Sequence, residues 1–207
     1  MLRLVDILAS LGLARSIALV GNGPLRRAEG EAIDRHTLVV RFNSCSNYGK
    51  GGYRTDVLVL TNTGDPAEAF ARNEGAINEE ALVSARAFWI ARSPELVAIE
   101  SKRRPDQAAY WTDHATEIIH NRVGSRPFRF LDARIYWSAH KALKKFGATD
   151  WHQPSTGMLA LFHIKTTIPW PRRVTLFGFT HEGWERHPWQ AERALIDRWR
   201  WVRRSKT

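Results

Sequence analysis

Short, continuous apolar runs recur along the chain and predict strands that are buried on both faces. A half-exposed strand would alternate apolar and polar positions, whereas these runs are nearly unbroken and end at turn-forming or charged residues. The runs are IALVG (17–21), TLVVRF (37–42), DVLVL (56–60), AFWIA (87–91), FRFLD (128–132) and RVTLFGF (173–179). The pattern predicts a largely parallel sheet.

Segments with a helical pattern lie between these runs. Their apolar residues recur at spacings of three and four, which places them on one face of a helix. The segments cover residues 66–85, 93–104, 106–122, 133–147 and 155–167. Alternating strands and helices predict an α/β fold with a single doubly wound sheet and helices on both faces. In such a fold the ligand lies at the carboxyl ends of the strands.

The chain is expected to form one domain over residues 1–207. No repeat, low-complexity tract or Gly/Ser linker divides it. The first segment, 1–15, is predicted to be an N-terminal packing helix, because it is too short to span a bilayer and Asp6 interrupts its apolar stretch.

The chain is strongly basic, with a formal net charge of +10, which suits an anionic partner such as a nucleotide, a nucleic acid or a membrane surface. Basic residues concentrate in 189–204, where Arg193, Arg200 and Arg204 lie beside apolar residues at helical spacing. We therefore predict a basic C-terminal helix. Its charged face points to solvent, to an anionic acceptor or to the inner membrane surface.

The chain has one cysteine, Cys45, which excludes an internal disulfide. Secreted domains of this size often carry several disulfides, so the cysteine content favours a reducing compartment. A cytoplasmic location is expected.

The first predicted strand ends in a glycine turn, Gly21-Asn22-Gly23-Pro24. Glycines let the backbone approach a ligand closely and let its N–H groups point at an anion. A dinucleotide-binding fingerprint has a third glycine where this chain has Arg26, and an acidic residue at the end of the second strand. An arginine can instead hold the extra phosphate of NADP, so an NADP-dependent oxidoreductase remains an alternative.

Polar residues at two strand ends and at one helix start form a candidate binding site. Asn22 ends the first strand and Asn43 the second, so both amides can face one ligand, although each can also cap its own turn. Ser155 or Thr156 is the N-cap of a helix and Gly157 follows it. The free N–H groups and the dipole of that helix favour a phosphate.

Candidate catalytic residues follow the last predicted strand. They are His181, His187 and Glu192. A neutral histidine, with a reference pKa of about 6.5, can accept a proton from a hydroxyl nucleophile. The chain contains no Asp-x-Asp pair, so the carboxylates that usually bring a metal ion to a sugar nucleotide are missing and no metal is expected.

Four motifs, in order, resemble those of the sialyltransferase family of animals and some bacteria. VGNGP with the later RFN resembles the large sialylmotif, and PSTGMLALF with LFGF resembles the small one. HPWQAE matches the His-x4-Glu of the very short motif. The resemblance covers residues 17–192 and implies a bacterial member of this family.

The resemblance implies a Rossmann-like, inverting and metal-independent glycosyltransferase. It would move sialic acid, Kdo or a similar keto-acid sugar from CMP to a glycan or lipid-linked hydroxyl, with no cofactor besides the CMP-sugar substrate. His187 would be the base, Glu192 would support it, and His181 would assist the leaving phosphate. The residues that would bind the donor are Gly21, Asn22, Gly23, Asn43, Ser155, Thr156, Gly157 and Gly178. A non-catalytic nucleotide- or RNA-binding protein of the same fold is the alternative, although the chain has no recognisable nucleic-acid module.

Overall fold

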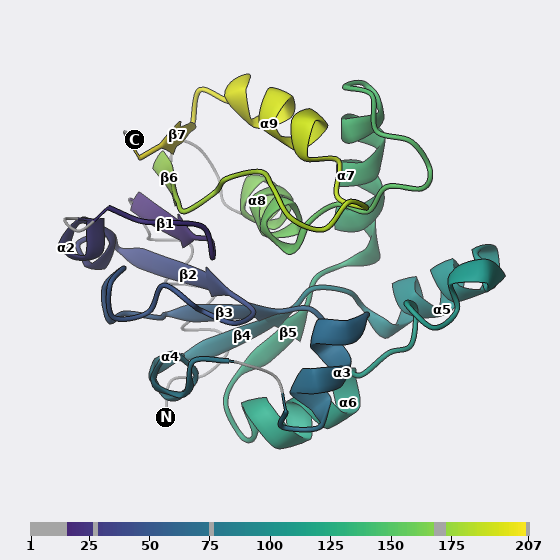
Figure 1. Cartoon of the computed structure of the whole chain (residues 1–207), viewed down its shortest axis with the longest axis horizontal. Helices are drawn as coiled ribbons and strands as arrows, with labels where there is room; N and C mark the ends of the chain where they lie inside the picture. The colour runs from purple at the N-terminus through teal and green to yellow at the C-terminus, as the bar shows by residue number, and fades with distance from the viewer. Residues whose placement is uncertain (1–15, 27–28, 75–76, 168–172, 206–207) are drawn as a thin grey trace.

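The computed structural model describes residues 16–26, 29–74, 77–167 and 173–205 (Figure 1). The helix expected over 1–15 lies outside these residues. No helix in the described ranges is long and apolar enough to cross a membrane.

One seven-stranded parallel sheet forms the centre of the molecule, with the strand order β5-β4-β3-β2-β1-β6-β7. Its register places Ile17 beside both Leu38 and Val174. The strands are β1 (Ser16–Val20), β2 (Leu38–Phe42), β3 (Val57–Leu60), β4 (Ala87–Ile90), β5 (Phe128–Phe130), β6 (Arg173–Phe177) and β7 (Val202–Arg204). The predicted α/β fold is confirmed, and the six apolar runs correspond to β1 through β6.

The helices follow three of the five predicted segments, and the other two segments are divided. The segment 106–122 is not one helix, because residues 108–114 form a turn and a loop. The segment 66–85 forms two helices, because Asn73 adopts a left-handed φ of 59° and Asn78 starts a new helix by accepting a hydrogen bond from the N–H of Ala81. The helices are α2 (Glu29–Asp34), α3 (Asp65–Ala71), α4 (Glu79–Ser84), α5 (Pro94–Arg103), α6 (Ala115–Ile118), α7 (Ala133–Lys144), α8 (Thr156–Thr167) and α9 (Trp189–Asp197). Two short turns, the 3-10 turn η1 (Pro105–Gln107) and the π turn η2 (Ile119–Val123), complete them.

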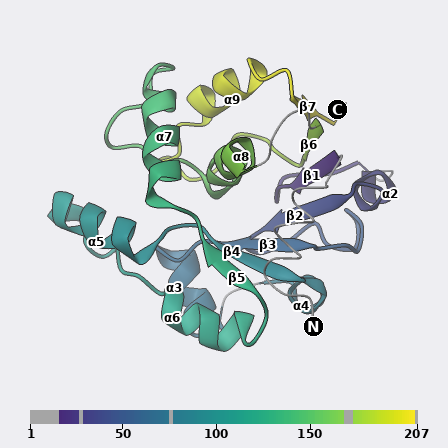
Figure 2. The ribbon, with the colours of Figure 1, turned by 180° about the vertical axis from the view of Figure 1, so that it is seen from behind.

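Helices cover both faces of the sheet (Figures 1 and 2). Ile17 and Leu19 of β1 pack into the core beneath α7, α8 and α9, whereas Ala18 and Val20 pack on the opposite face, near α2. Helix α8 lies directly on the sheet and is buried along most of its length. Because both faces are covered, every residue of β2, β3 and β4 is buried, which explains why these strands are apolar apart from Arg41.

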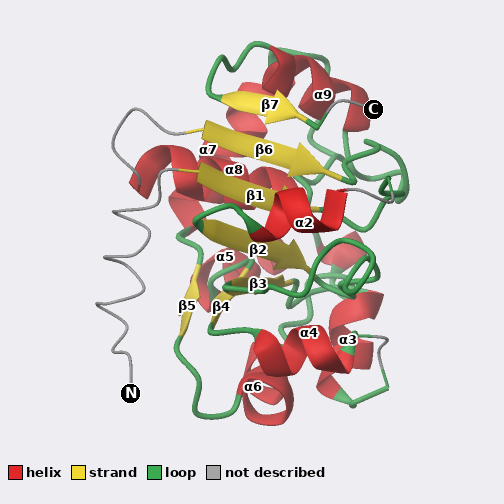
Figure 3. Ribbon diagram, turned by 90° about the vertical axis from the view of Figure 1, so that its left-hand side faces the viewer, coloured by secondary structure: helices red, strands yellow, loops and turns green. Residues whose placement is uncertain are grey.

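The sheet changes its winding direction between β1 and β6. The chain leaves β1 toward α2 on one face and leaves β6 toward α9 on the other (Figure 1). Figure 3 shows β1, β2 and β6 pointing toward the same edge, where loops gather. Connections that diverge in this way open a crevice at the carboxyl ends of the two strands, which is where ligands bind in doubly wound folds.

The predicted C-terminal helix is wrong beyond Asp197. Helix α9 ends there, and Val202–Arg204 forms β7, which pairs in parallel with β6. The helical spacing of Trp199 and Val202 comes from a turn instead, in which the N–H of Val202 donates to the carbonyl of Trp199. The free edge of β6 offers β7 its backbone hydrogen bonds, and this tertiary contact overrides the local helical pattern.

Candidate functional site

A cleft with two adjoining lobes lies at the carboxyl ends of the strands. The glycine lobe, of about 370 Å³, is lined by the loops after β1, β2 and β6 and by the start of α8. The arginine lobe, of about 320 Å³, is lined by Arg92 after β4 and by the residues that follow β2 and β3. Asn43, Thr156 and His187 line both lobes. Among the residues expected at the site, Glu192 alone is absent from the lining of either lobe.

The glycines of the glycine lobe let two loops pack together. The N–H of Gly21 donates to the Phe177 carbonyl at 2.8 Å, and the N–H of Gly23 donates to the Gly178 carbonyl at 3.0 Å. Gly178 has a φ of +63°, and a Cβ added there would lie 2.8 Å from the carbonyl oxygen of Gly23. These glycines are thus required for packing between the ends of β1 and β6, and both N–H groups are engaged within the protein.

The asparagine amides tie neighbouring strand ends to one another. Asn22 Nδ2 donates to the Phe42 carbonyl at 3.1 Å, and its Oδ1 accepts from the N–H of Ser46 at 3.1 Å. Asn43 Oδ1 accepts from the N–H of Thr61 at 2.9 Å. The Nδ2 group of Asn43 has no acceptor among the described residues, so it remains a donor for a ligand in the cleft.

Glu192 supports the start of α8. Its carboxylate accepts two hydrogen bonds of 2.7 Å, one from the N–H of Ser155 and one from the Ser155 hydroxyl. Ser155 Oγ in turn accepts from the N–H of Met158 and caps the helix. Burial raises the pKa of Glu192 to about 7, although the hydrogen bonds from Ser155 act in the opposite direction. The two residues join α9 to α8.

The first turn of α8 presents backbone donors to the cleft. The N–H groups of Thr156 and Gly157 have no acceptor within the described ranges, as is usual for the first residues of a helix. A Cβ at Gly157 would lie 2.7 Å from the ring of Phe179, so a glycine is needed for that aromatic side chain to cover the turn. This helix start therefore retains the partial positive charge that favours an anion.

His187 is a neutral hydrogen-bond acceptor at the junction of the lobes. Its Nδ1 lies 2.7 Å from the carbonyl oxygen of Gln153, so Nδ1 carries the proton and Nε2 is left as an acceptor. Burial lowers the pKa of His187 to about 4, and the nearby charge of Arg92 acts in the same direction. Gln153 is itself held by the hydroxyl of Tyr136, which donates to Gln153 Oε1 at 2.8 Å.

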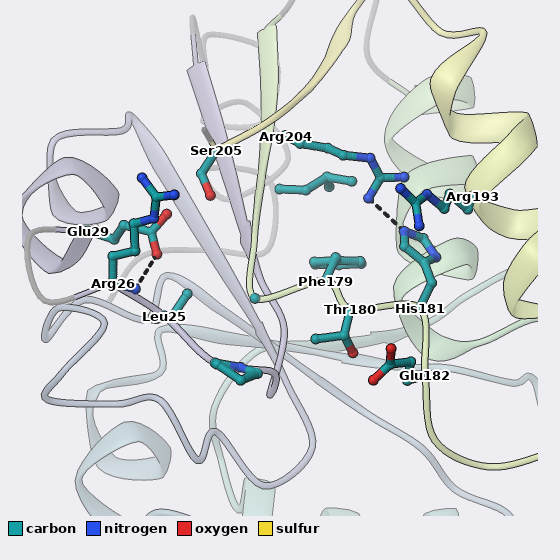
Figure 4. A pocket seen from close by; sticks show the side chains of 13 residues that line it. Leu25, Arg26, Glu29, Phe179, Thr180, His181, Glu182, Arg193, Arg204 and Ser205 are labelled. Carbon is teal, nitrogen blue, oxygen red and sulfur yellow. Dashed lines mark hydrogen bonds between the residues drawn. The ribbon is translucent and has the colours of Figure 1, made fainter. Parts of the chain in front are cut away.

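His181 belongs to a different polar cluster. Arg204 Nη1 lies 2.8 Å from His181 Nε2 and donates to it. Burial lowers the pKa of His181 to about 4, and the charge of Arg204 adds to this effect. Figure 4 shows this pair beside Arg193 in a neighbouring cavity of about 500 Å³, which shares His181, Gly178 and Phe179 with the glycine lobe. No hydrogen bond in the described structure joins His187 to His181 or to Glu192.

Arg92 is a site residue that the sequence motifs missed. It is 1% exposed, and it donates from Nη1 to the Thr61 hydroxyl at 3.1 Å and from Nη2 to the Tyr110 hydroxyl at 3.0 Å. The segment 61–130 contains no motif that identifies it. One signal was present, however, because Arg92 is a polar residue just after a buried strand, as Asn22 and Asn43 are.

The site is therefore rich in hydrogen-bond donors and has one well-placed neutral acceptor. The donors are Arg92, Asn43 and the start of α8, and the acceptor is His187 Nε2. This arrangement suits a ligand with several oxygen acceptors and one hydroxyl group. Within the described residues, no group of three or more His, Cys, Asp or Glu side chains is placed to hold a metal ion.

The chain is similar over most of its length to a protein with a named genetic context. It is 31% identical over 189 residues to the urease operon 23 kDa accessory protein of Rhizobium meliloti (strain 1021), and the match covers 88% of each chain. No family model matches the chain.

This similarity overturns the expected membership of the sialyltransferase family and the activity that it implied. The prediction of a glycosyltransferase that moves sialic acid or Kdo from CMP is therefore wrong. The expected partners, namely a CMP-sugar donor, a glycan or glycolipid acceptor and an anionic membrane surface, are wrong for the same reason. The alternatives of an NADP-dependent oxidoreductase and a nucleotide- or RNA-binding protein have no support from this relative either.

The structure gives a physical reason for the misleading motifs. Gly21 and Gly178 occur where they do because two loops of a parallel sheet pack closely. Ser155 of PSTG and Glu192 of HPWQAE occur together because they form one buried pair at the start of α8. Packing at this edge of the sheet therefore explains much of the resemblance to the sialyltransferase motifs. A shared substrate is not needed to explain it.

Proposed function

Because this chain belongs to the family of the urease operon 23 kDa accessory protein, we propose that it is an accessory protein of a urease system. The observation that carries the proposal is the extent of the match, which covers 88% of both chains. In this proposal the protein supports the production of active urease, and its partners are urease subunits or other accessory proteins of that system.

We propose that the protein acts through the cleft, as a binding site. Two of the three side chains expected to catalyse are engaged inside the protein. Both oxygens of the Glu192 carboxylate bond to Ser155, and His181 Nε2 accepts from Arg204. The cleft instead offers uncommitted donors beside His187, which supports ligand binding more than group transfer.

A cytoplasmic location is part of this proposal. Cys45 is buried and unpaired, as is common for structural cysteines in reducing compartments. Burial raises the pKa of its thiol to about 12, which keeps it protonated and unreactive.

Deletion of the gene for this chain from its host tests the proposal. Urease activity in cell extracts, divided by the amount of urease subunits on an immunoblot, is expected to fall at least several-fold, because less of the urease becomes active. A plasmid copy of the gene is expected to restore the activity. Unchanged activity per urease subunit in the deletion strain would refute the accessory role.

A further inference from the structure

The arginine lobe contains a buried positive charge without a negative partner. Arg92 is 1% exposed, and its side chain is a guanidinium cation. Its two side-chain hydrogen bonds go to the neutral hydroxyls of Thr61 and Tyr110. No carboxylate of the described chain lies within ion-pair distance of it. A buried charge is costly unless a partner compensates it, so this lobe favours an anion.

Further donors in the same lobe have no partner in the described structure. Arg92 Nε and the hydroxyl of Thr63 are both buried without a hydrogen bond. Asn43 Nδ2 and the N–H of Thr156 also lack an acceptor there. All four residues line the lobe. Unsatisfied buried groups are uncommon in folded proteins, and several around one cavity indicate a ligand that would satisfy them.

The acidic and aromatic residues of the lobe agree with this interpretation. Its lining contains one carboxylate, that of Asp65, which is exposed at the start of α3. The ring of Trp184 stacks on that of Tyr110 with centroids 5.1 Å apart, and Trp184 is 40% exposed. The two rings form an apolar wall next to the buried cation. A ligand with an anionic group and a flat apolar body would fit both features.

We propose that the arginine lobe binds a small organic molecule through an oxyanion group, either a carboxylate or a phosphate. Arg92, the Thr63 hydroxyl and the first N–H of α8 hold the oxyanion. Tyr110 and Trp184 cover the apolar part of the molecule. Because this site is inferred from the unsatisfied donors, it stands independently of the accessory role in a urease system.

Calorimetric titration of the purified full-length chain with benzoate and phenyl phosphate tests the site. Benzyl alcohol, which has the same ring without a charge, is the neutral control. At least one anion is expected to bind with one-to-one stoichiometry, and benzyl alcohol is expected not to bind. Stronger binding of phenyl phosphate identifies a phosphate site, and stronger binding of benzoate identifies a carboxylate site. No heat with either anion, or equal binding of benzyl alcohol, would overturn the proposal.

Substitutions locate the binding in the lobe. Arg92→Met is expected to weaken the binding of the preferred anion at least tenfold, whereas Arg134→Met removes an exposed positive charge on α7 and should leave the binding unchanged.

A second variant, Thr63→Val, tests the same site if Arg92→Met does not fold. It is expected to weaken the binding of the preferred anion about threefold or more. Thr55→Val is its matched control, because the Thr55 hydroxyl is also buried without a partner but lies outside the lobe. Equal effects of the two threonine substitutions would contradict the site.

Discussion

At the scale of single residues, the site depends on which partner each polar side chain takes. Of the residues that the sequence singled out, Asn22 and Asn43 line the cleft and Glu192 lies outside its lining. Their partners could not be predicted, because Phe42, Thr61 and Ser155 come close only once the strands pair and α9 packs on α8. Glu192 shows the consequence. Its match to the His-x4-Glu motif implied support for His187, but its carboxylate is buried against Ser155.

The burial of Glu192 predicts an unusual pH dependence of stability. The folded-state pKa is about 7, above the usual value of 4.5. As the pH rises from 4.5 to 7, the unfolded chain ionises at this position while the folded chain stays protonated. The free energy of unfolding therefore falls across this interval, by on the order of 3 kcal/mol for this one group.

The comparison of the wild type with Glu192→Gln isolates that effect, because Gln does not titrate and the histidine contributions are common to both proteins. Urea denaturation of both proteins at about pH 5 and about pH 8 gives the difference in the free energy of unfolding. The stability of the wild type relative to Glu192→Gln is expected to be higher at the lower pH. A difference that does not vary with pH would show that Glu192 ionises normally.

At the scale of elements, the apolar pattern predicted the central strands well and the edges poorly. Strands β2, β3 and β4 are buried throughout, and burial explains why all their residues except Arg41 are apolar. Strand β7 has only three residues and is basic, and it forms because it pairs with β6. Its sequence carries no local signal for that contact. The short helix α2 was likewise not predicted, since its six residues bury only Ile33.

The packing between the loops after β1 and β6 predicts a large effect of Gly178→Ala. The new Cβ would lie 2.8 Å from the Gly23 carbonyl oxygen and 3.0 Å from that of Gly21, in addition to the strain of a φ of +63°. Gly124→Ala is the matched control, because its φ is +62° and nothing lies within 4 Å of the added Cβ.

We expect Gly124→Ala to reduce the free energy of unfolding by about 1 kcal/mol and Gly178→Ala to reduce it by about 2–4 kcal/mol. Urea denaturation of the two variants and the wild type measures both values. Equal losses would show that left-handed backbone strain, and not the close approach of the two loops, is the reason for Gly178.

At the scale of the whole molecule, the fold was predictable from the sequence and the function was not. Alternating apolar runs and helical segments specify a doubly wound sheet, and that sheet places polar residues at its carboxyl edge. The same edge constrains the sequences of many unrelated proteins, since tight loops need glycine and helix starts need Ser or Thr. A resemblance that rests on those residues therefore indicates a similar fold and does not identify a substrate. Arg92, which distinguishes this cleft, lies in none of the motifs.

The proposed role of the protein in urease production depends on its cleft. The most direct test measures urease activity per urease subunit in the deletion strain that carries either His187→Ala or His120→Ala. His187 lines both lobes, whereas His120 lies in η2, outside both. With both variants present at wild-type levels, His120→Ala is expected to restore full activity and His187→Ala to leave it at least several-fold lower. Full activity with His187→Ala would contradict the proposed role of the cleft in urease production.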